Sequence, residues 1–196
     1  MQTAHALSQK GNIRPPAESN FADQALIEAI AEGDGHAMRA LFLRHAVKVF
    51  RFILSFTKHQ LLAEDLVNEV FLDVWQQSGK FDGRSHVSTW LLGVARRKAI
   101  NAMRQRRYEG LTQNATAQAE DPSDNTGTLL DDDRGNRLRK CVTRLSPMHR
   151  EIVDLVYYHQ RPVAEVADIL GIPPGWVKMH MFDARSELAD LVREAG

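Results

Sequence analysis

Apolar residues recur at helical spacing along most of the chain, from Phe21 to Arg107 and again from Leu138 onwards. Such spacing predicts helices, because residues three or four positions apart lie on one face. The interruptions, rich in glycine, proline or polar residues, are 33–35, 58–61, 78–85, 146–147, 160–162 and 171–175. No useful length of alternating apolar and polar residues indicates a strand. We therefore expect an all-α fold class.

Two stretches lack this periodicity. Residues 1–19 are polar and predict a disordered tail, with the first helix starting near Asn20. Residues 109–135 carry many Asp, Asn, Thr and Gln and few large apolar side chains, which is typical of a flexible acidic linker. The linker separates two expected small helical domains, 20–108 and 136–196.

Charge is balanced overall but not locally. The 196 residues contain 25 Lys and Arg and 25 Asp and Glu, so bulk charge suggests no partner. Residues 81–108, however, carry seven cations against Asp82, and residues 109–135 carry seven acids against Arg134. A basic helix thus precedes an acidic linker, and neutrality is a cancellation between neighbours.

Several classes of function find no support in the sequence. The only cysteine, Cys141, cannot form an internal disulfide, and there is neither a membrane-spanning apolar run nor a secretory signal. We expect a cytoplasmic protein with no membrane insertion. The eight histidines and Cys141 lack ligand spacing, so we expect no metal and no cofactor. With no nucleophile elbow or phosphate-binding glycine loop, nothing indicates an enzyme.

The segment AEDLVNEVFLDVWQQ, residues 63–77, predicts an amphipathic helix with one leucine on its polar side. Val67, Val70, Phe71 and Val74 share the inward face. A lone outward leucine is common on protein surfaces, but among acids and amides it also suits a protein-docking anchor. The outward positions are Asp65, Asn68, Glu69, Leu72 and Gln76.

A second helix, residues 88–107, separates apolar from cationic positions. Its predicted core face is Leu92, Ala95, Ala99, Ala102 and Met103. The opposite face is Trp90, Gly93, Arg97, Asn101 and Arg104, preceded by a loop of small and polar residues. Tryptophan can stack on an unpaired base and arginine can hold phosphate, although the tryptophan could equally fill the core.

A third segment, residues 161–185, has the spacing of a helix-turn-helix. Ala167 would permit close helix crossing, Gly171 would make the turn and Val177 would fill the core. In the second helix Lys178 and Arg185 are offset by Asp183 and Glu187. A neutral recognition helix would attract phosphates only weakly.

With these motifs the chain resembles a bacterial sigma factor of the extracytoplasmic-function group. A DL-x-QE-x-F motif corresponds to residues 65–71, and F-x-G-x-S-x-x-x-TWL to residues 81–91. The resemblance implies that the first motif docks on core RNA polymerase and that the second, with its helix, opens and reads the minus-ten promoter element. It further implies that residues 136–196 read the minus-thirty-five element and that an anti-sigma protein regulates the chain.

The resemblance assigns candidate DNA-binding residues to both domains. For the minus-ten element they are Gly83, Arg84, Ser85, His86, Ser88, Thr89, Trp90, Arg96, Arg97, Lys98, Asn101 and Arg104. For the minus-thirty-five element they are Pro174, Gly175, Trp176, Lys178, Met179, His180 and Arg185.

The chain departs from the family pattern at several of these positions. Asn68 replaces a glutamine, and Arg97 an asparagine. His180 stands where relatives commonly carry arginine, and Asp183 where they carry a basic or aromatic residue. Two alternatives to a sigma factor therefore stay open. One is a sigma-like adaptor whose recognition helix binds protein, and the other is a conventional helix-turn-helix regulator of duplex DNA.

Overall fold

The computed structural model describes residues 16–112 and 133–194, and within them all regular structure is helical. The first half contains α1 (Pro16–Ala31), α2 (Gly35–Thr57), α3 (Gln60–Gln77), a 3₁₀ turn (Ser78–Lys80) and α4 (Val87–Thr112). The second half contains α5 (Asp133–Arg144), α6 (Pro147–Val153), a π-helical turn (Asp154–Tyr158), α7 (Val163–Leu170) and α8 (Pro174–Glu194). The all-α expectation is confirmed. None of the described helices is long and apolar enough to cross a membrane.

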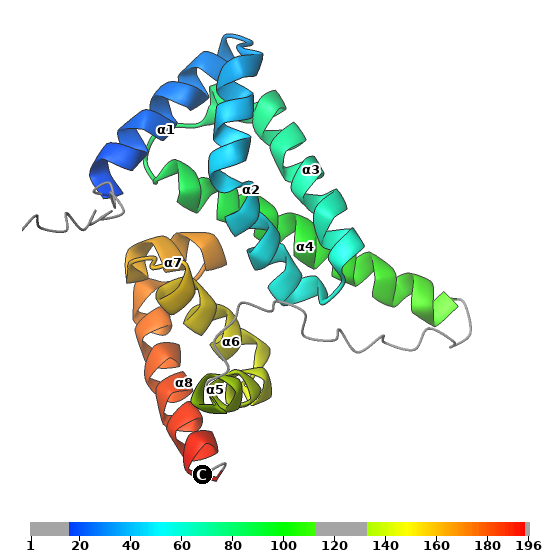
Figure 1. Ribbon diagram of the computed structural model, residues 1–196, viewed down its shortest axis with the longest axis vertical. Helices are drawn as coiled ribbons and strands as arrows, with labels where there is room; N and C mark the ends of the chain where they lie inside the picture. The colour runs from blue at the N-terminus through cyan, green and yellow to red at the C-terminus, as the bar shows by residue number, and fades with distance from the viewer. Residues whose placement is uncertain (1–15, 113–132, 195–196) are drawn as a thin grey trace, which may run out of the picture.

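Helices α1 to α4 form a bundle in the upper part of Figure 1. Its centre contains Leu41, Phe52 and Ile53 of α2 and Val70 of α3, each fully buried. Asp34 caps α2, and its carboxylate accepts the N–H of His36 at 2.7 Å. The amphipathic spacing of the sequence therefore produces the bundle directly.

A buried carboxylate joins α1 to α2. Asp23 contacts the guanidinium of Arg44 and, at 2.8 Å, Nε2 of His45. Burial by itself would raise the pKa of Asp23, but the hydrogen bonds and charges of His45 and Arg44 outweigh it and lower that pKa. The ionised carboxylate therefore stabilises the α1–α2 contact until acid protonates it.

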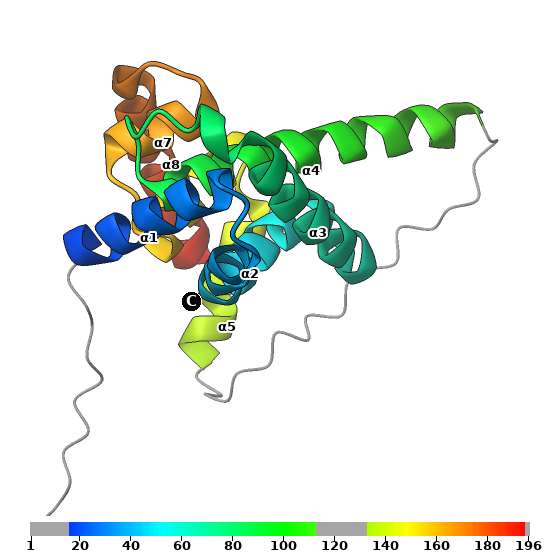
Figure 2. The ribbon, with the colours of Figure 1, turned by 90° about the horizontal axis from the view of Figure 1, so that it is seen from above.

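Helix α4 extends beyond the bundle, as Figure 2 shows. Leu92, Ala95 and Ala99 on its first half are buried, as their spacing predicts, but Met103 is 42% exposed. The expected core position of Met103 is wrong because the side chains from residue 103 to 108 are all exposed, outside the packed part of the helix.

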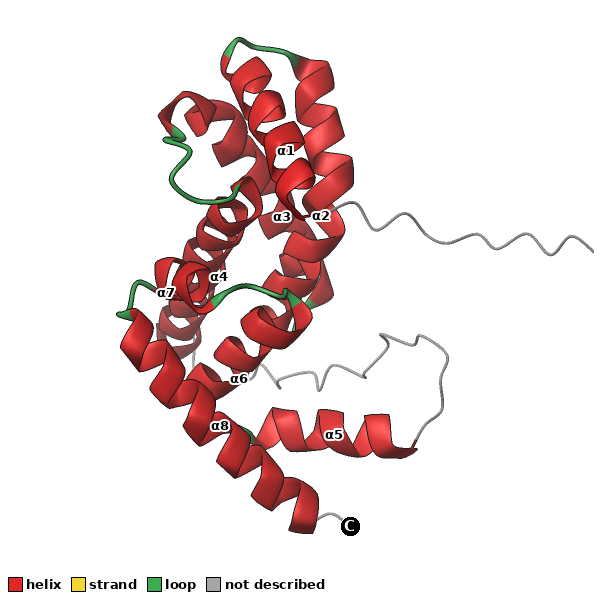
Figure 3. Ribbon diagram, turned by 90° about the vertical axis from the view of Figure 1, so that its left-hand side faces the viewer, coloured by secondary structure: helices red, strands yellow, loops and turns green. Residues whose placement is uncertain are grey.

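Helices α5 to α8 form the second half (Figure 3). The predicted helix-turn-helix is present as α7 and α8: Ala167 and Val177 are buried, and Gly171 ends α7 at φ +69°, a left-handed conformation that glycine adopts without strain. Cys141 of α5 and Leu145, the residue that follows this helix, pack against Leu191 of α8 and join α5 to the end of α8.

The two halves pack against one another instead of standing apart. Helix α7 lies on α4 (Figure 1), and one continuous apolar cluster includes Leu91 and Leu92 of α4 together with Leu155 and Val166 of the second half. The intervening residues of the expected linker, 113–132, lie outside the described residues.

Helix ends differ from expectation at three places. Helix α1 begins at Pro16, inside the expected tail, because proline fits the first helical position, where its missing N–H has no partner to lose. Helix α4 continues to Thr112, since no proline interrupts it, and α5 begins at Asp133 in an acidic run of the kind favoured at helix starts. The expected linker is thus shortened at both ends.

Candidate protein and nucleic-acid interfaces

The outward face of α3 is open to solvent. Its five predicted residues, Asp65, Asn68, Glu69, Leu72 and Gln76, are all exposed, while Val67, Val70, Phe71 and Val74 are buried. Leu72 is 55% exposed, and Trp75, three positions further along the same face, is 40% exposed. We call the five predicted residues the docking face. An apolar anchor with a polar rim is the composition of a protein interface.

A hydrogen bond to α1 fixes the end of the loop that precedes α4. Gly83 adopts φ +71°, and the N–H of Val87 donates to Oδ1 of Asn20 at 3.1 Å, which ties the start of α4 to α1. Trp90 is half-buried, and its ring lies 5.2 Å from the ring of Phe81 between centroids. Trp90 therefore fits both interpretations of the sequence, core packing and base stacking, because it packs on the bundle and remains partly accessible to solvent.

The cations of α4 divide into two groups. Arg97 and Arg104 are exposed, as is Asn101. Lys98 instead bridges Asp73 at 3.0 Å and Glu69 at 3.3 Å. Burial would lower the pKa of Lys98, but these two carboxylates outweigh it and raise that pKa. Lys98 links α3 to α4, whereas Arg97 and Arg104 point to solvent with their charge available.

Glu165 of α7 contacts three partners at the loop before α4 and the first turn of that helix. Its carboxylate lies 2.8 Å from Nδ1 of His86 and 3.2 Å from Nη1 of Arg161, and it accepts the hydroxyl of the buried Thr89. Arg161 also donates to Oγ of Ser88 at 2.8 Å. Three of the candidate minus-ten residues are therefore occupied by the second half of the chain.

A second ion pair crosses the same interface. Nε of Arg96 on α4 lies 2.6 Å from Oε1 of Glu151 on α6, and the side chain of Glu151 is only 8% exposed. Burial raises the pKa of Glu151, the negative charge of Asp154 adds to that effect, and Arg96 opposes it. We call the contacts of Glu165 and Glu151 with the first half the closed interface.

The first turns of α8 present the candidate minus-thirty-five residues. Pro174, Gly175, Trp176, Lys178 and Met179 are exposed. His180 is half-buried, and Nε of Arg185 donates to the hydroxyl of Tyr157 at 2.7 Å. The structure therefore brings these residues onto one helix but leaves two of them partly engaged within the protein.

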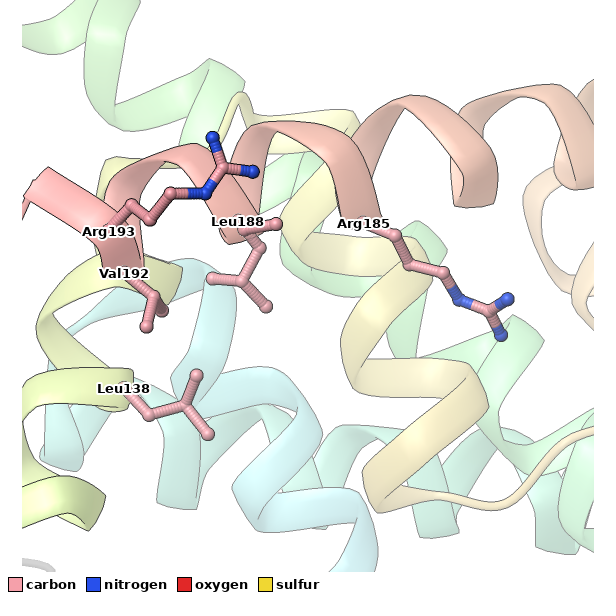
Figure 4. Close-up of a pocket in the computed structure, with 6 residues that line it drawn as sticks. Leu138, Arg185, Leu188, Val192 and Arg193 are labelled. Atoms are coloured by element: carbon pink, nitrogen blue, oxygen red, sulfur yellow. The ribbon is translucent and has the colours of Figure 1, made fainter.

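An open, mainly apolar groove of about 640 Å³ lies between α5 and α8. Leu138 of α5 faces Leu188 and Val192 of α8, with Arg185 and Arg193 beside them (Figure 4). Of the candidate DNA-binding residues only Arg185 lines it, so the groove adjoins the candidate minus-thirty-five surface at that residue.

Sequence reasoning missed several residues of these surfaces. Trp75 could have been found, because its spacing from Leu72 is helical. Glu151, Glu165 and Tyr157 carry no local signal, since each acts through a residue far away in the sequence.

Comparison with known families identifies the class. Residues 41–108 match the model of sigma-70 region 2, and residues 141–190 match the model of sigma-70 region 4. The first match spans the docking face, the loop and most of α4, and the second spans α6 to α8. A regulator that used only a helix-turn-helix would leave the first match unexplained.

Comparison with individual sigma factors indicates the group of the family to which the chain belongs. The chain is 27% identical over 164 residues to the ECF RNA polymerase sigma factor SigK of Mycolicibacterium vanbaalenii, covering 81% of this chain and 83% of the relative. It is 28% identical over 172 residues to the RNA polymerase sigma factor CarQ of Myxococcus xanthus, covering 86% and 96%. The chain belongs to the extracytoplasmic-function group of the sigma-70 family, whose members direct RNA polymerase to promoters.

Solved structures share the fold. CnrH, in complex with the cytosolic domain of CnrY, has a TM-score of 0.66 at 22% identity and covers 89% of this chain and 99% of its own. The sigma factor RpoE of Bartonella quintana, in complex with the anti-sigma factor NepR, has a TM-score of 0.62 at 23% identity and covers 79% and 96%. Both halves of the chain therefore have counterparts in known folds.

Proposed function

We propose that this sigma factor fastens to core RNA polymerase through the docking face of α3 and reads promoter DNA through the loop at 83–89 and α4. The observation that carries this proposal is the outward face of α3. It combines the exposed Leu72 with the carboxylates of Asp65 and Glu69, next to a helix that carries exposed arginines. An apolar anchor supplies affinity, and the charged rim supplies orientation.

Strand opening would proceed by differential binding. Extruding a base from duplex DNA costs a few kcal/mol, and stacking on an aromatic ring returns about 1–3 kcal/mol per base. Trp90 supplies a ring whose position is fixed by Phe81, and Arg97 and Arg104 are in reach of the backbone along the same helix. No covalent chemistry by the chain is needed.

The remaining assignments follow from the same reasoning. Residues 20–108 form the domain that binds polymerase and the minus-ten element, and residues 136–196 form the domain that reads the minus-thirty-five element through α8. We place this activity in the cytoplasm, where polymerase and chromosome meet.

The closed interface implies a resting form of the protein. Thr89, Ser88 and Arg96 cannot contact DNA while Glu165, Arg161 and Glu151 hold them. The halves must therefore separate before the whole promoter surface can work. An anti-sigma protein that bound both halves together would prolong the resting form, and the complexes solved for CnrH and RpoE support such a partner.

Run-off transcription with purified core polymerase and a library of promoter fragments tests the proposal. We expect the full chain to start transcription at a defined subset of promoters and the Leu72→Arg variant to start at none. Failure of the wild-type chain to bind core polymerase, or binding without initiation at any template, would overturn the proposed function. The second result would favour the adaptor alternative.

A further inference from the structure

Helix α8 carries three potential metal ligands on one face. His180, Asp183 and Glu187 are spaced by three and four residues, so their side chains leave the helix in the same direction. Helix α6 contributes His149 from the opposite side, and its ring centroid lies 5.5 Å from that of His180. Two imidazoles and two carboxylates thus meet where α6 packs on α8.

The distances suit a single ion. One ligand atom from each of His149, His180 and Asp183 lies within 4.8 Å of the other two. Donor atoms around tetrahedral zinc are about 3.3 Å apart, given bonds of about 2.0 Å, so modest side-chain rotations would close the site. Asp183 is exposed, which leaves the ion a path from solvent.

Two further contacts point to an ion here. Nδ1 of His149 lies 2.8 Å from Oε2 of Glu187. A carboxylate on one imidazole nitrogen is the usual support of a histidine that binds metal through the other nitrogen. Within the described chain, Nδ1 of His180 is buried and has no hydrogen-bond partner. A buried polar atom without a partner is unfavourable, and coordination of a metal ion by Nδ1 would give this atom a partner.

We propose that His149, His180 and Asp183 bind one divalent transition-metal ion of the zinc class, with Glu187 as the group that orients His149. Imidazole together with carboxylate favours zinc and its first-row neighbours over Mg²⁺ and Ca²⁺, which prefer oxygen ligands alone. The ion would tie α6 to α8 and stabilise the second half of the chain.

The proposed metal site also offers a reason for the neutral charge of the recognition helix. Lys178 and Arg185 are cancelled by Asp183 and Glu187, so the segment 174–188 is neutral. A bound ion would add two positive charges to this neutral segment. This step rests on the proposed role of α8 in DNA binding, whereas the metal site itself does not.

Metal binding is measured on the tag-free full chain after treatment with EDTA. Co²⁺ serves as a coloured substitute for Zn²⁺, and competition with a chromophoric chelator gives the Zn²⁺ affinity. We expect one ion per chain, a Tm raised by several degrees with Zn²⁺, and no comparable effect of Mg²⁺ or Ca²⁺. Trp176 lies 6.3 Å from His180 between ring centroids, so Co²⁺ should quench its fluorescence, and Trp176→Phe should remove that signal.

Amino-acid substitutions test whether Zn²⁺ binds at this site or at other histidines of the chain. His149→Ala and His180→Ala should weaken Zn²⁺ binding at least about 10-fold, and Asp183→Asn should do so without a folding defect, because residue 183 is exposed. His36→Ala, an exposed histidine on α2, is the matched control and should bind as the wild type does. Absence of one-to-one binding by the wild type, or equal affinity in Asp183→Asn and His36→Ala, would overturn the proposal.

Discussion

The first half of the chain carries two candidate functional surfaces that differ in what covers them. The docking face of α3 is open along its whole length, with Leu72 more than half exposed. The candidate minus-ten residues, on the loop before α4 and on α4 itself, lie partly under α6 and α7, where Glu165 and Glu151 bind their polar groups. Under the proposed function, this contrast implies an order of events in which the closed protein binds polymerase before it reads DNA.

The cations of α4 likewise fall into two groups, those exposed to solvent and those paired with carboxylates. Arg97 and Arg104 are solvated and ready for phosphate, whereas Arg96 and Lys98 are paired with carboxylates of other helices. Counting positive residues along α4 therefore overstates the charge that DNA would meet in the closed form.

The largest expected effect comes from the open surface. Leu72→Arg places a charge where an apolar anchor should enter polymerase, and we expect affinity for core polymerase to fall by about 30- to 1,000-fold, the range of a truncated hot spot. Leu43→Arg is the matched control, because Leu43 is 70% exposed on α2 outside the docking face. Fluorescence titration with labelled core enzyme measures both, and equal losses would refute the assignment of the docking face.

Substitution in the closed interface should instead raise an affinity, that of the loop before α4 and of α4 for single-stranded DNA. Glu165→Ala removes the carboxylate that His86, Thr89 and Arg161 share. Each charge-assisted hydrogen bond contributes about 1.5–3 kcal/mol, so we expect the closed population to fall and affinity for a single-stranded minus-ten oligonucleotide to rise about 10-fold. Fluorescence anisotropy measures that affinity.

Asp168→Ala is the control for that experiment. Asp168 is an exposed acid on the same helix, so its removal changes the charge equally without touching the interface. An equal gain in both variants would mean that charge, and not opening, controls access to the loop.

A smaller effect, on the salt dependence of binding, should distinguish the solvent-exposed arginines of α4 from the cations that are paired with carboxylates. Arg104→Ala should lower the salt dependence of single-strand binding by about 0.7 in the slope of log K against log salt, the value for one lost phosphate contact. Lys98→Ala should leave the slope unchanged, because its ammonium is held by Asp73 and Glu69. A loss of slope in the Lys98 variant would show that the α3–α4 bridge opens on DNA.

The features that the sequence could predict are local. Helical spacing places Val70 inward and Leu72 outward, and the positions of Ala167, Gly171 and Val177 define the helix-turn-helix within eleven residues. Spacing fails where a helix leaves its neighbours, as at Met103, which is exposed because, within residues 16–112 and 133–194, no other helix packs on the end of α4.

The features that the sequence could not predict are long-range. Glu165 meets Thr89 across 76 positions, and Glu151 meets Arg96 across 55. His149 approaches His180 only because α6 packs on α8, so a search for ligand spacing along the chain passes over the proposed metal site. Helical periodicity does not reveal such pairs, since each depends on how helices distant in the sequence pack against one another.

The smallest expected effect is a pH dependence of the closed interface. In the closed form, burial raises the pKa of Glu151, whereas opening returns this side chain to water and its pKa to the ordinary range. The closed form therefore binds more protons in the window between the two values. Acidification through that window should favour closing, and the contribution of this group should be lost as the pH rises through it.

Small-angle scattering of the full chain across that window measures the opening. Glu151→Gln cannot titrate, so it should remove the dependence due to this residue while the His86–Glu165 pair is present in both proteins. If wild type and variant instead respond identically to pH, burial of Glu151 does not link protonation to closing. The closed interface would then depend on Glu165 and the apolar contacts around Leu155 and Val166 alone.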